Sequence, residues 1–432
     1  MSKKFRYIIL ATGFITFVIL APATLLYVKG VGFNFRTKTF QQTGLLAIRT
    51  DPDKVNIFVN EELSRKSSGD INFLKAGEYA VSIQKPGYFT WSKRLQILPN
   101  LVTWANPSPN KLYLFSENPN PETINNNITD FNFSKNTLTA LSQSVLSVTE
   151  LGSLNSTYNY PFSKPVSRLK VSPGIKYAIL YSDTAEKMSN SVLVFKYNDH
   201  SFTDISSLFT ESPILEFSSN DNLFALNKSI LYSVNITDKT KNAVAQNIQA
   251  FATLDKDIYY IKKTAAGNAL YILPDGGKEQ TLASAMPNFK NGNLFVTSQK
   301  QIFLLADGAL YKINQEPQLL ASGITDYNFN SAANTLIFVH NGELSNYNFS
   351  SQQVDLITRS NESLINPILQ QYTSMAFVSQ GNKATAMELD SRDRQNEYIF
   401  YSGKNIKKIM LSDQAQYMFV LDGTDLKMLK TR

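Results

Sequence analysis

Residues 302–313 read Ile-Phe-Leu-Leu-Ala-Asp-Gly-Ala-Leu-Tyr-Lys-Ile, two short apolar runs on either side of Asp307-Gly308. An Asp-Gly pair between such runs predicts a β-hairpin with a tight turn. The pattern recurs with turns at Ser142-Gln143, Asn227-Lys228, Ala266-Gly267-Asn268, Asn341-Gly342, Gly381-Asn382 and Asp422-Gly423, and with a longer loop between Tyr177 and Tyr197. Roughly eight hairpins at intervals of about 40 residues predict the blades of a β-propeller, with four strands in each blade.

Most of these hairpins follow one further predicted strand with an apolar-x-apolar-Ser pattern or a close variant of it. This strand is found at residues 131–134, 169–172, 215–218, 327–330 and 409–412. Together with Pro173-Gly174-Ile175-Lys176 and the apolar run after it, residues 169–180 resemble the repeat of TolB-type propellers. The resemblance extends loosely over residues 128–432 and implies a seven- or eight-bladed propeller, of which the hairpin pattern favours eight.

The end of the array predicts how the propeller closes. The last predicted blade reaches Arg432 after three strands, and propellers often complete such a blade with an N-terminal strand because an unpaired edge is a liability. Residues 99–127 are rich in Pro, Asn and Ser and read as a linker. They contain one apolar strand, at 111–116, and we expect its residues Leu112 to Phe115 to pair with the last blade.

Residues 44–98 alternate between apolar and polar side chains as β-strands do, and turn residues such as Asp51-Pro52-Asp53 and Pro86-Gly87 separate the strands. The stretches that carry a family resemblance are Ile48-Arg49-Thr50-Asp51-Pro52, Val55-Asn56-Ile57-Phe58-Val59-Asn60, Leu74-Lys75-Ala76-Gly77-Glu78-Tyr79-Ala80-Val81 and Lys85-Pro86-Gly87-Tyr88. In this order they resemble the PEGA domain, and they depart from its pattern at Asp53-Lys54, at Asn60-Glu61 and at 67–70. The resemblance implies a small β-domain of prokaryotic envelope proteins, without catalytic residues.

The segment 7–28 is apolar and carries no charge, and its length of about 22 residues is that needed to cross a bilayer. Lys3, Lys4 and Arg6 precede it and Lys29 follows it. We therefore predict a cytoplasmic tail at 1–6, a transmembrane helix at 7–28 in contact with the lipid bilayer, and a linker at 29–43. A signal peptide cleaved near Ala21-Pro22-Ala23 and a buried core helix are the alternatives.

The orientation of this predicted membrane protein rests on its charges. Positive side chains are nearly balanced across the segment 7–28, but those closest to it lie on its N-terminal side. We expect a single-pass protein of the cell membrane with its N-terminus inside and its C-terminal domains on the extracytoplasmic side. The predicted fold is all-β apart from the one N-terminal helix.

Charge and composition argue against several classes of protein. The chain has 432 residues, with 42 Lys plus Arg against 35 Asp plus Glu and a formal charge of +7. Six of the basic residues lie in 1–38, where there is no acidic residue, so the remainder is nearly neutral and nucleic-acid binding is not expected. The chain has no Cys and two His, which excludes disulfides and thiolate chemistry and disfavours zinc.

No catalytic motif stands out in the sequence. His200 and His340 are predicted to be solvated turn residues, and we expect no metal and no cofactor. The carboxylates Glu388, Asp390, Asp393 and Glu397 alternate with Arg392 and Arg394, a pattern typical of an exposed, self-neutralising loop rather than of a glycosidase site. Tyr88, Phe89 and Trp91 fit core packing better than an exposed carbohydrate-stacking strip. No catalytic, metal-binding or ligand-binding residue is assigned.

The order of helix, small β-domain and propeller indicates a membrane-anchored envelope protein with a non-enzymatic binding or scaffolding role. Propellers bind ligands at the mouth of the central channel, where we expect recognition of a protein or a glycan. Two alternatives remain open: a propeller hydrolase or lyase acting on envelope polysaccharide, and a subunit of a sensory or secretion apparatus.

Overall fold

The chain forms two compact units. The computed structural model describes residues 3–28, 31–34, 39–106, 111–153, 157–182 and 191–432. The first unit consists of Met1–Asn118, Glu388–Tyr398 and Arg432, and the second consists of Pro119–Met387 and Ile399–Thr431. Residues up to Asn118 and a segment from the C-terminal region thus belong to the first unit, whereas the predicted boundaries lie at 98 and 127.

The N-terminal helix α1 (Lys3–Val28) contains the whole uncharged segment 7–28, with Pro22 inside it. Ten large apolar side chains of this helix are 51–74% exposed: Tyr7, Ile9, Leu10, Phe14, Ile15, Phe17, Val18, Ile19, Leu20 and Leu25. In the part of the chain that the structure describes, no helix is sufficiently long and apolar to span a membrane. The helix itself is confirmed, and its predicted role as a transmembrane span is not supported by the structure.

The rest of the first unit is a small β-domain. Among the described residues it has two four-stranded sheets, one ordered β1-β2-β6 with β9 also on β2, the other ordered β5-β4-β7-β8, and a parallel pair of β3 with β10. The strands are β1 (Val31–Asn34), β2 (Thr39–Ile48), β3 (Thr50–Asp51), β4 (Asn56–Val59), β5 (Glu62–Arg65), β6 (Gly69–Lys75), β7 (Gly77–Gln84), β8 (Trp91–Ile97), β9 (Val102–Trp104) and β10 (Leu112–Tyr113).

Both sheets of this domain contribute to one hydrophobic core. Leu46 and Ile48 of β2 pack with Ile57 of β4, Val81 of β7 and Trp91 of β8, and all five are at most 1% exposed. The alternation of apolar residues that predicted these strands thus places one side of each strand in the core.

The apolar strand expected to close the propeller lies in this domain instead. Leu112 pairs in parallel with Thr50, and Tyr113 with Asp51. Leu112 and Leu114 enter the core of the domain, which covers the apolar side of the strand. The prediction that residues 112–115 complete the last blade is therefore wrong.

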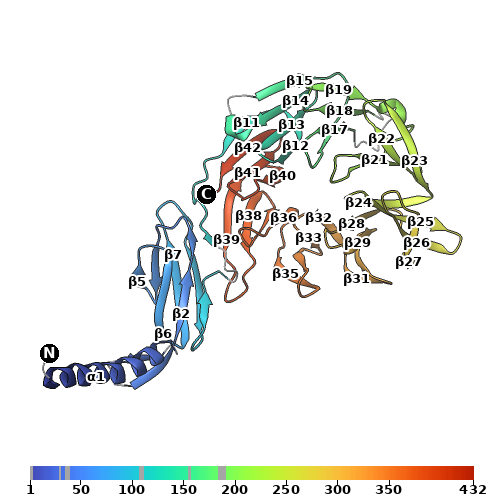
Figure 1. The fold of residues 1–432 in the computed structure, drawn as a ribbon. Coiled ribbons are helices and arrows are strands. Elements are labelled where there is room, and N and C mark those ends of the chain that lie inside the picture. Colours follow the sequence, from blue (N-terminus) through green and yellow to red (C-terminus); the bar gives the residue numbers. More distant parts are fainter. Residues whose placement is uncertain (1–2, 29–30, 35–38, 107–110, 154–156, 183–190) are drawn as a thin grey trace. The chain divides into compact units, whose positions relative to one another are not determined.

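The second unit contains eight four-stranded sheets within the described residues, and Figure 1 shows them following one another around a centre. The first four are built from β12 (Ile128–Ser134), β13 (Thr137–Ser142), β14 (Val145–Glu150), β15 (Thr157–Pro161); β16 (Arg168–Val171), β17 (Tyr177–Tyr181), β18 (Val192–Lys196), β19 (Ser201–Asp204); β20 (Ile214–Phe217), β21 (Leu223–Asn227), β22 (Ile230–Asn235), β23 (Thr240–Gln246); and β24 (Ile248–Leu254), β25 (Asp257–Thr264), β26 (Gly267–Leu273), β27 (Gln280–Met286). Two short 3-10 helices, η1 (Leu151–Ser153) and η2 (Ser206–Leu208), lie in connections.

The remaining four sheets continue in chain order, and the last of them includes one strand from an earlier part of the chain. They are built from β28 (Gly292–Val296), β29 (Ile302–Ala306), β30 (Ala309–Ile313), β31 (Pro317–Ser322); β32 (Ile324–Asn330), β33 (Thr335–His340), β34 (Glu343–Asn348), β35 (Gln353–Arg359); β36 (Leu364–Gln370), β37 (Met375–Gln380), β38 (Lys383–Glu388), β39 (Glu397–Ser402); and β40 (Ile406–Leu411), β41 (Tyr417–Asp422), β42 (Asp425–Lys430) with β11 (Glu122–Asn125).

The strand that closes the last sheet is β11. It pairs antiparallel with β42, with Glu122 opposite Met428 and Thr123 opposite Lys427. Closure by an N-terminal strand was expected, but β11 reads Glu-Thr-Ile-Asn and lacks the apolar run that drew attention to residues 112–115.

The serine at the end of the repeated apolar-x-apolar-Ser pattern has a structural role. Ser172 Oγ accepts hydrogen bonds from the backbone N–H groups of Lys176 and Tyr177, both at 3.1 Å. Ser412 Oγ accepts two equivalent bonds at 3.0 Å, from Gln416 and Tyr417. The serine therefore satisfies backbone donors in the turn between the first and second strands of a sheet, which explains why the pattern recurs.

The aspartates of the Asp-Gly turns have a second role. The Asp307 carboxylate accepts hydrogen bonds from the backbone N–H groups of Asn291 and Lys290, at 2.9 and 3.0 Å, and these bonds lower its pKa. Burial raises the pKa of Asp422, but hydrogen bonds from Asn405, Tyr401 and Lys404 outweigh this effect, and the pKa is lowered. Each aspartate thus ties its own turn to an adjacent segment of chain.

These lowered pKa values predict acid sensitivity of the second unit. A carboxylate whose pKa falls on folding stabilises the folded state above its unfolded pKa, and this contribution is lost as the pH falls through the folded pKa. We expect the calorimetric unfolding temperature to fall below about pH 4. The variant Asp307→Asn/Asp422→Asn should show a smaller acid-induced fall than the parent between pH 7 and pH 3. An equal fall in both proteins would contradict the assignment.

Candidate functional site

The first strands of the eight sheets lie nearest the centre of the second unit, and the fourth strands lie at its periphery (Figure 1). Two cavities are bordered by these inner strands. One, of about 350 Å³, is lined by residues of β16, β20, β24, β28 and β32. The other, of about 650 Å³, is lined by residues of β12, β32, β36 and β40. We call these two cavities together the channel site.

Polar side chains bridge neighbouring inner strands around the smaller cavity. Lys170 Nζ of β16 donates to Glu216 Oε1 of β20 at 2.5 Å and to the Leu215 carbonyl at 3.1 Å. Asn293 Nδ2 of β28 donates to the hydroxyl of Tyr327 in β32 at 2.7 Å. Burial is the main cause of a raised Tyr327 pKa; the Asn293 hydrogen bond acts in the opposite direction, and Glu216 and Asp326 raise it further. Tyr327 therefore stays protonated at neutral pH.

Carboxylates and an amide bridge the inner strands on the side of the larger cavity. Asp130 of β12, which is 5% exposed, pairs with Lys408 Nζ of β40 at 2.7 Å and accepts the backbone N–H of Leu169 in β16 at 2.9 Å. Asp326 of β32 likewise accepts the backbone N–H of Asn366 in β36 at 2.6 Å. Asn366 Nδ2 then donates to the Lys407 carbonyl at 3.1 Å. The acidic groups here are held by backbone donors and a lysine.

The chemistry of the channel site follows from these contacts. Both of its lysines, Lys170 and Lys408, are paired with carboxylates, whereas Asp326 and Asp413 of the larger cavity have no ion pair among the described residues. Amides and phenols supply much of the remaining polarity, with Asn328, Asn330 and Gln371 exposed at the larger cavity and Tyr372 41% exposed beside them. Such a lining suits a neutral ligand rich in hydroxyl or amide groups, which hydrogen-bonds to the amides and stacks on an aromatic ring.

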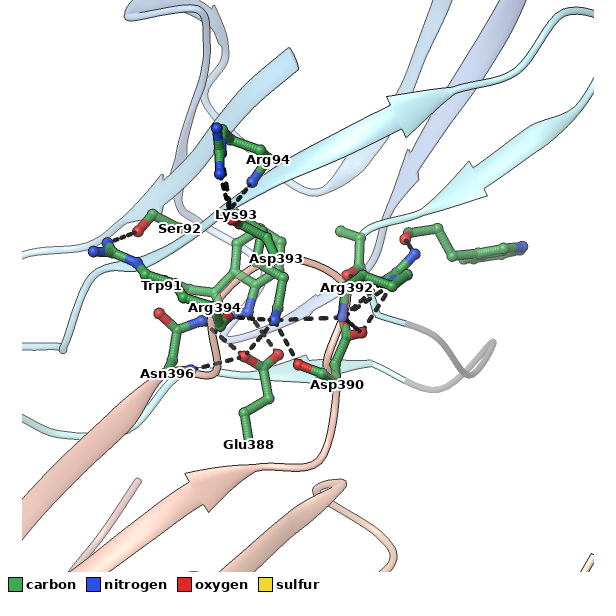
Figure 2. A network of polar contacts seen from close by, with 12 residues as sticks. Trp91, Ser92, Lys93, Arg94, Glu388, Asp390, Arg392, Asp393, Arg394 and Asn396 are labelled. Atoms are coloured by element: carbon green, nitrogen blue, oxygen red, sulfur yellow. Dashed lines mark hydrogen bonds and ion pairs between the residues drawn. The ribbon is translucent and has the colours of Figure 1, made fainter. Parts of the chain in front are cut away.

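The acidic cluster at 388–397 is not the exposed loop that the sequence predicts. Glu388 and Asp390 are 4% and 5% exposed, and the segment Glu388–Tyr398 is part of the first unit. Figure 2 shows their side chains gathered with Lys93 and Trp91 of β8. We call this group, with Arg392 and Asn396, the Lys93 network. The expectation of self-neutralisation by the intervening arginines holds only in part, because Asp390 pairs with Arg392 at 2.8 Å.

Lys93 is the central cation of this network. Its side chain has 0% exposure, and Nζ lies 3.2 Å from Glu388 Oε2 and 3.7 Å from Asp390 Oδ2. It also donates to the carbonyls of Asp390 and Arg394, at 2.7 and 2.9 Å. Glu388 accepts further bonds from Trp91 Nε1 at 3.0 Å and Asn396 Nδ2 at 2.8 Å. The buried charges are paired and hydrogen-bonded, which makes this a structural network rather than a catalytic site.

Sequence analysis missed Lys93, although the strand pattern carries a signal. In β8, Trp91, Leu95 and Ile97 alternate on the buried side, and Lys93 occupies the same side. A lysine among inward positions requires a buried acceptor. The identity of that acceptor is not encoded locally, because Glu388 lies 297 residues from Trp91.

The remaining residues that the sequence singled out do not form a common site. Trp91 is 1% exposed and Tyr88 packs against the same core, which confirms core packing for these aromatics and not an exposed strip. His200 is exposed, stacks on Tyr160 at 5.3 Å and hydrogen-bonds to its hydroxyl. His340 contacts Ser345 at 3.1 Å. Over the described ranges, no group of three or more His, Cys, Asp or Glu is placed to hold a metal ion.

Comparisons with known proteins bear on both units. Residues 43–109 match the PEGA domain. This match covers the strands β3 to β9 and part of β2, and it extends beyond the segment 44–98 that the sequence singled out. A comparison with curated proteins finds no match to the chain.

Solved structures establish the fold of the second unit. The C-terminal WD40 domain of Sif2 is 11% identical, with a TM-score of 0.53 over 72% of this chain and 98% of that domain. The crystal structure of the eukaryotic initiation factor is 10% identical, with a TM-score of 0.52 over 73% of this chain and 88% of that chain. At such identities the likeness shows the fold alone, a β-propeller.

Proposed function

We propose that this protein is a non-enzymatic binding or scaffolding protein of the prokaryotic cell envelope, and that its channel site recognises a neutral glycan. The observation that carries the proposal is the lining of the channel site, where the lysines are paired and exposed amides together with Tyr372 are available for contact with a ligand. A protein ligand is the second candidate, since propellers also bind proteins at this face.

The contacts of two carboxylates on the inner strands, Asp130 and Asp326, support a non-enzymatic role. Retaining and inverting glycosidases need one carboxyl group as a proton donor and a second one free to act as nucleophile or base. Asp130 and Asp326 each accept two backbone N–H groups, and Asp130 also pairs with Lys408. These bonds commit both carboxylates to holding adjacent strands together.

The location is proposed from the N-terminal helix. Residues 7–28 carry no charge, and their large apolar side chains are exposed along α1, an arrangement that is costly in water and favourable in lipid. We propose that these residues attach the chain to the cell membrane, with the N-terminus inside and both β-units on the extracytoplasmic side. Flotation of the full chain with lipid vesicles tests the attachment.

Binding at the channel site is expected to depend on Asn293 and Tyr327. Each variant, Asn293→Ala or Tyr327→Phe, removes one hydrogen-bonding group and should weaken binding by up to about tenfold. The measurement is titration calorimetry with soluble peptidoglycan fragments. The control is Tyr158→Phe, which makes the same change at a tyrosine that is 57% exposed on the outer strand β15.

Three results would contradict this proposal. Equal losses in Tyr158→Phe and Tyr327→Phe would place the ligand elsewhere. Release of new reducing ends from the fragments by the parent protein would favour the hydrolase alternative. Absence of binding to these fragments and to a broader glycan panel would direct the search to a protein ligand.

A further inference from the structure

Exposed apolar side chains gather at one end of the β-domain in the first unit. Leu98, Leu101 and Val102 are 46%, 56% and 52% exposed, and Phe73 is 45% exposed. We call these four residues the edge patch. Isolated exposed apolar residues need no explanation, but several that share one location indicate an interaction surface.

Backbone contacts place the edge patch around residues 43–45 of β2. The backbone N–H of Asn100 donates to the Thr43 carbonyl at 2.9 Å, and that of Leu45 donates to the Leu101 carbonyl at 3.1 Å. Val102 pairs with Leu45. A Cβ atom added to Gly44 would lie 2.4 Å from the Leu98 carbonyl oxygen, so glycine is needed for this close approach.

Phe73 lies beside the same residues of β2, in the strand β6 that pairs with the opposite edge of β2. Leu74 pairs with Gly44 and Ile71 with Leu46, so that two residues of β6, including Phe73, stand opposite Leu45 alone. Phe73 has a φ of 61°, a conformation that is rare and costly for a bulky residue. This bulge keeps an aromatic side chain at the exposed end of the sheet.

The β1–β2 hairpin brings the end of the N-terminal helix to this location. Val31 pairs with Gln42, the residue before Thr43. Val31 lies three residues after Val28, the last residue of α1, and this length of chain spans at most about 10 Å. The C-terminal end of α1 is therefore held within a short distance of the edge patch by chain connectivity alone.

Charge near the edge patch fits an anionic lipid surface. Lys75 is exposed and pairs with Thr43. Basic residues beside exposed apolar side chains are typical of segments that lie in the bilayer interface.

We propose that the edge patch contacts the membrane interface, so that the β-domain rests on the bilayer to which α1 attaches the chain. This inference rests on the proposed membrane attachment and adds a second lipid-binding surface. Leu98, Leu101, Val102 and Phe73 enter the headgroup region, while Lys75 pairs with anionic headgroups.

The absence of cysteine makes a site-specific test direct. The full chain carrying Leu101→Cys, labelled with a polarity-sensitive dye, is reconstituted in vesicles of phosphatidylcholine and phosphatidylglycerol. We expect the emission to shift to shorter wavelength and to be quenched by nitroxide-labelled lipids. Val102→Cys should give the same result, which guards against a folding defect in one variant.

The matched control is Leu63→Cys in the same domain, at a leucine that is 49% exposed. Leu63 pairs with Phe58, which pairs with Ser82, whereas Leu98 follows Ile97, which pairs with Gly77. Ser82 lies five residues along β7 from Gly77, so the positions of Leu63 and Leu98 along the strand direction differ by about 16 Å. The dye at Leu63→Cys should show neither the shift nor the quenching.

The outcomes test the edge patch independently of the membrane attachment through α1. Vesicle flotation without a response at Leu101→Cys would overturn the edge patch and leave the attachment intact, whereas failure to float would overturn both. Equal responses at Leu63→Cys and Leu101→Cys would overturn a defined surface. A spectral shift without quenching by lipid nitroxides would mean that protein, such as a second copy of the chain, covers the patch.

Discussion

Lys93→Met is expected to destabilise the first unit by about 3–5 kcal/mol, because the substitution leaves buried carboxylates without their cation. Glu388 and Asp390 would remain at 4% and 5% exposure with a large desolvation cost. Arg392 pairs with Asp390 and would compensate part of that charge, but Glu388 would retain only neutral donors, Trp91 and Asn396. Most of the cost should therefore come from Glu388.

Hydrogen exchange detected by mass spectrometry is the suitable measurement, since a chain with two units need not unfold in one step. Exchange should accelerate in β7, β8 and Glu388–Tyr398 of Lys93→Met. The adjacent residue provides the control: Arg94 is 64% exposed and pairs with Asp393, so Arg94→Met should leave exchange unchanged. Adding Glu388→Gln to Lys93→Met should recover part of the loss, because it removes the unpaired charge. Equal effects of Lys93→Met and Arg94→Met would refute the role of the network.

The hairpins of the propeller could be predicted from the sequence because their signals are local. Asp307-Gly308 fixes a turn through the conformations of two adjacent residues, and the flanking runs reveal which side of each strand is buried. The repeated first strands were found for the same reason, and Ser172 and Ser412 show that their terminal serine acts within five residues.

Contacts between distant parts of the chain could not be predicted in the same way. The strand β11 is polar and short, and only its pairing with β42 makes it part of a sheet. Residues 112–115 had the stronger apolar pattern. Such a pattern indicates that one side of the strand is buried, but it does not indicate whether the core of the β-domain or that of the propeller buries it. Lys93 and Glu388 belong to one network although sequence alone relates neither to the other.

The channel site illustrates the same limit for function. Lys170, Asn293 and Tyr327 belong to separate strands, and the repeated pattern at 169–172 and 327–330 predicts a strand without indicating a binding role. They become neighbours of one cavity only because the sheets follow one another around a centre. Sequence analysis placed binding at the propeller channel as a hypothesis but had no means of naming the residues.

Phe419→Ala is expected to destabilise the second unit by about 3–5 kcal/mol, the usual cost of removing a fully buried aromatic side chain. Phe419 of β41 has 0% exposure and stacks on Phe133 of β12 with the ring centroids 4.7 Å apart. Around this pair, Leu421 and Leu426 of the last sheet pack with Phe131 of the first sheet. The cavity left by Phe419→Ala therefore lies at the seam where the final sheet meets the first.

The position of this seam predicts which strands of Phe419→Ala show faster hydrogen exchange. Because the last sheet depends on β11 for its fourth strand, loosening of the seam should increase hydrogen exchange first in β11, β12 and β40 to β42, with smaller changes in β24 to β31. Tyr158→Ala removes an aromatic side chain that is 57% exposed and should leave exchange nearly unchanged. Uniform acceleration across all eight sheets in Phe419→Ala would instead mean that the second unit opens as a single cooperative body, with no weaker point at its closure.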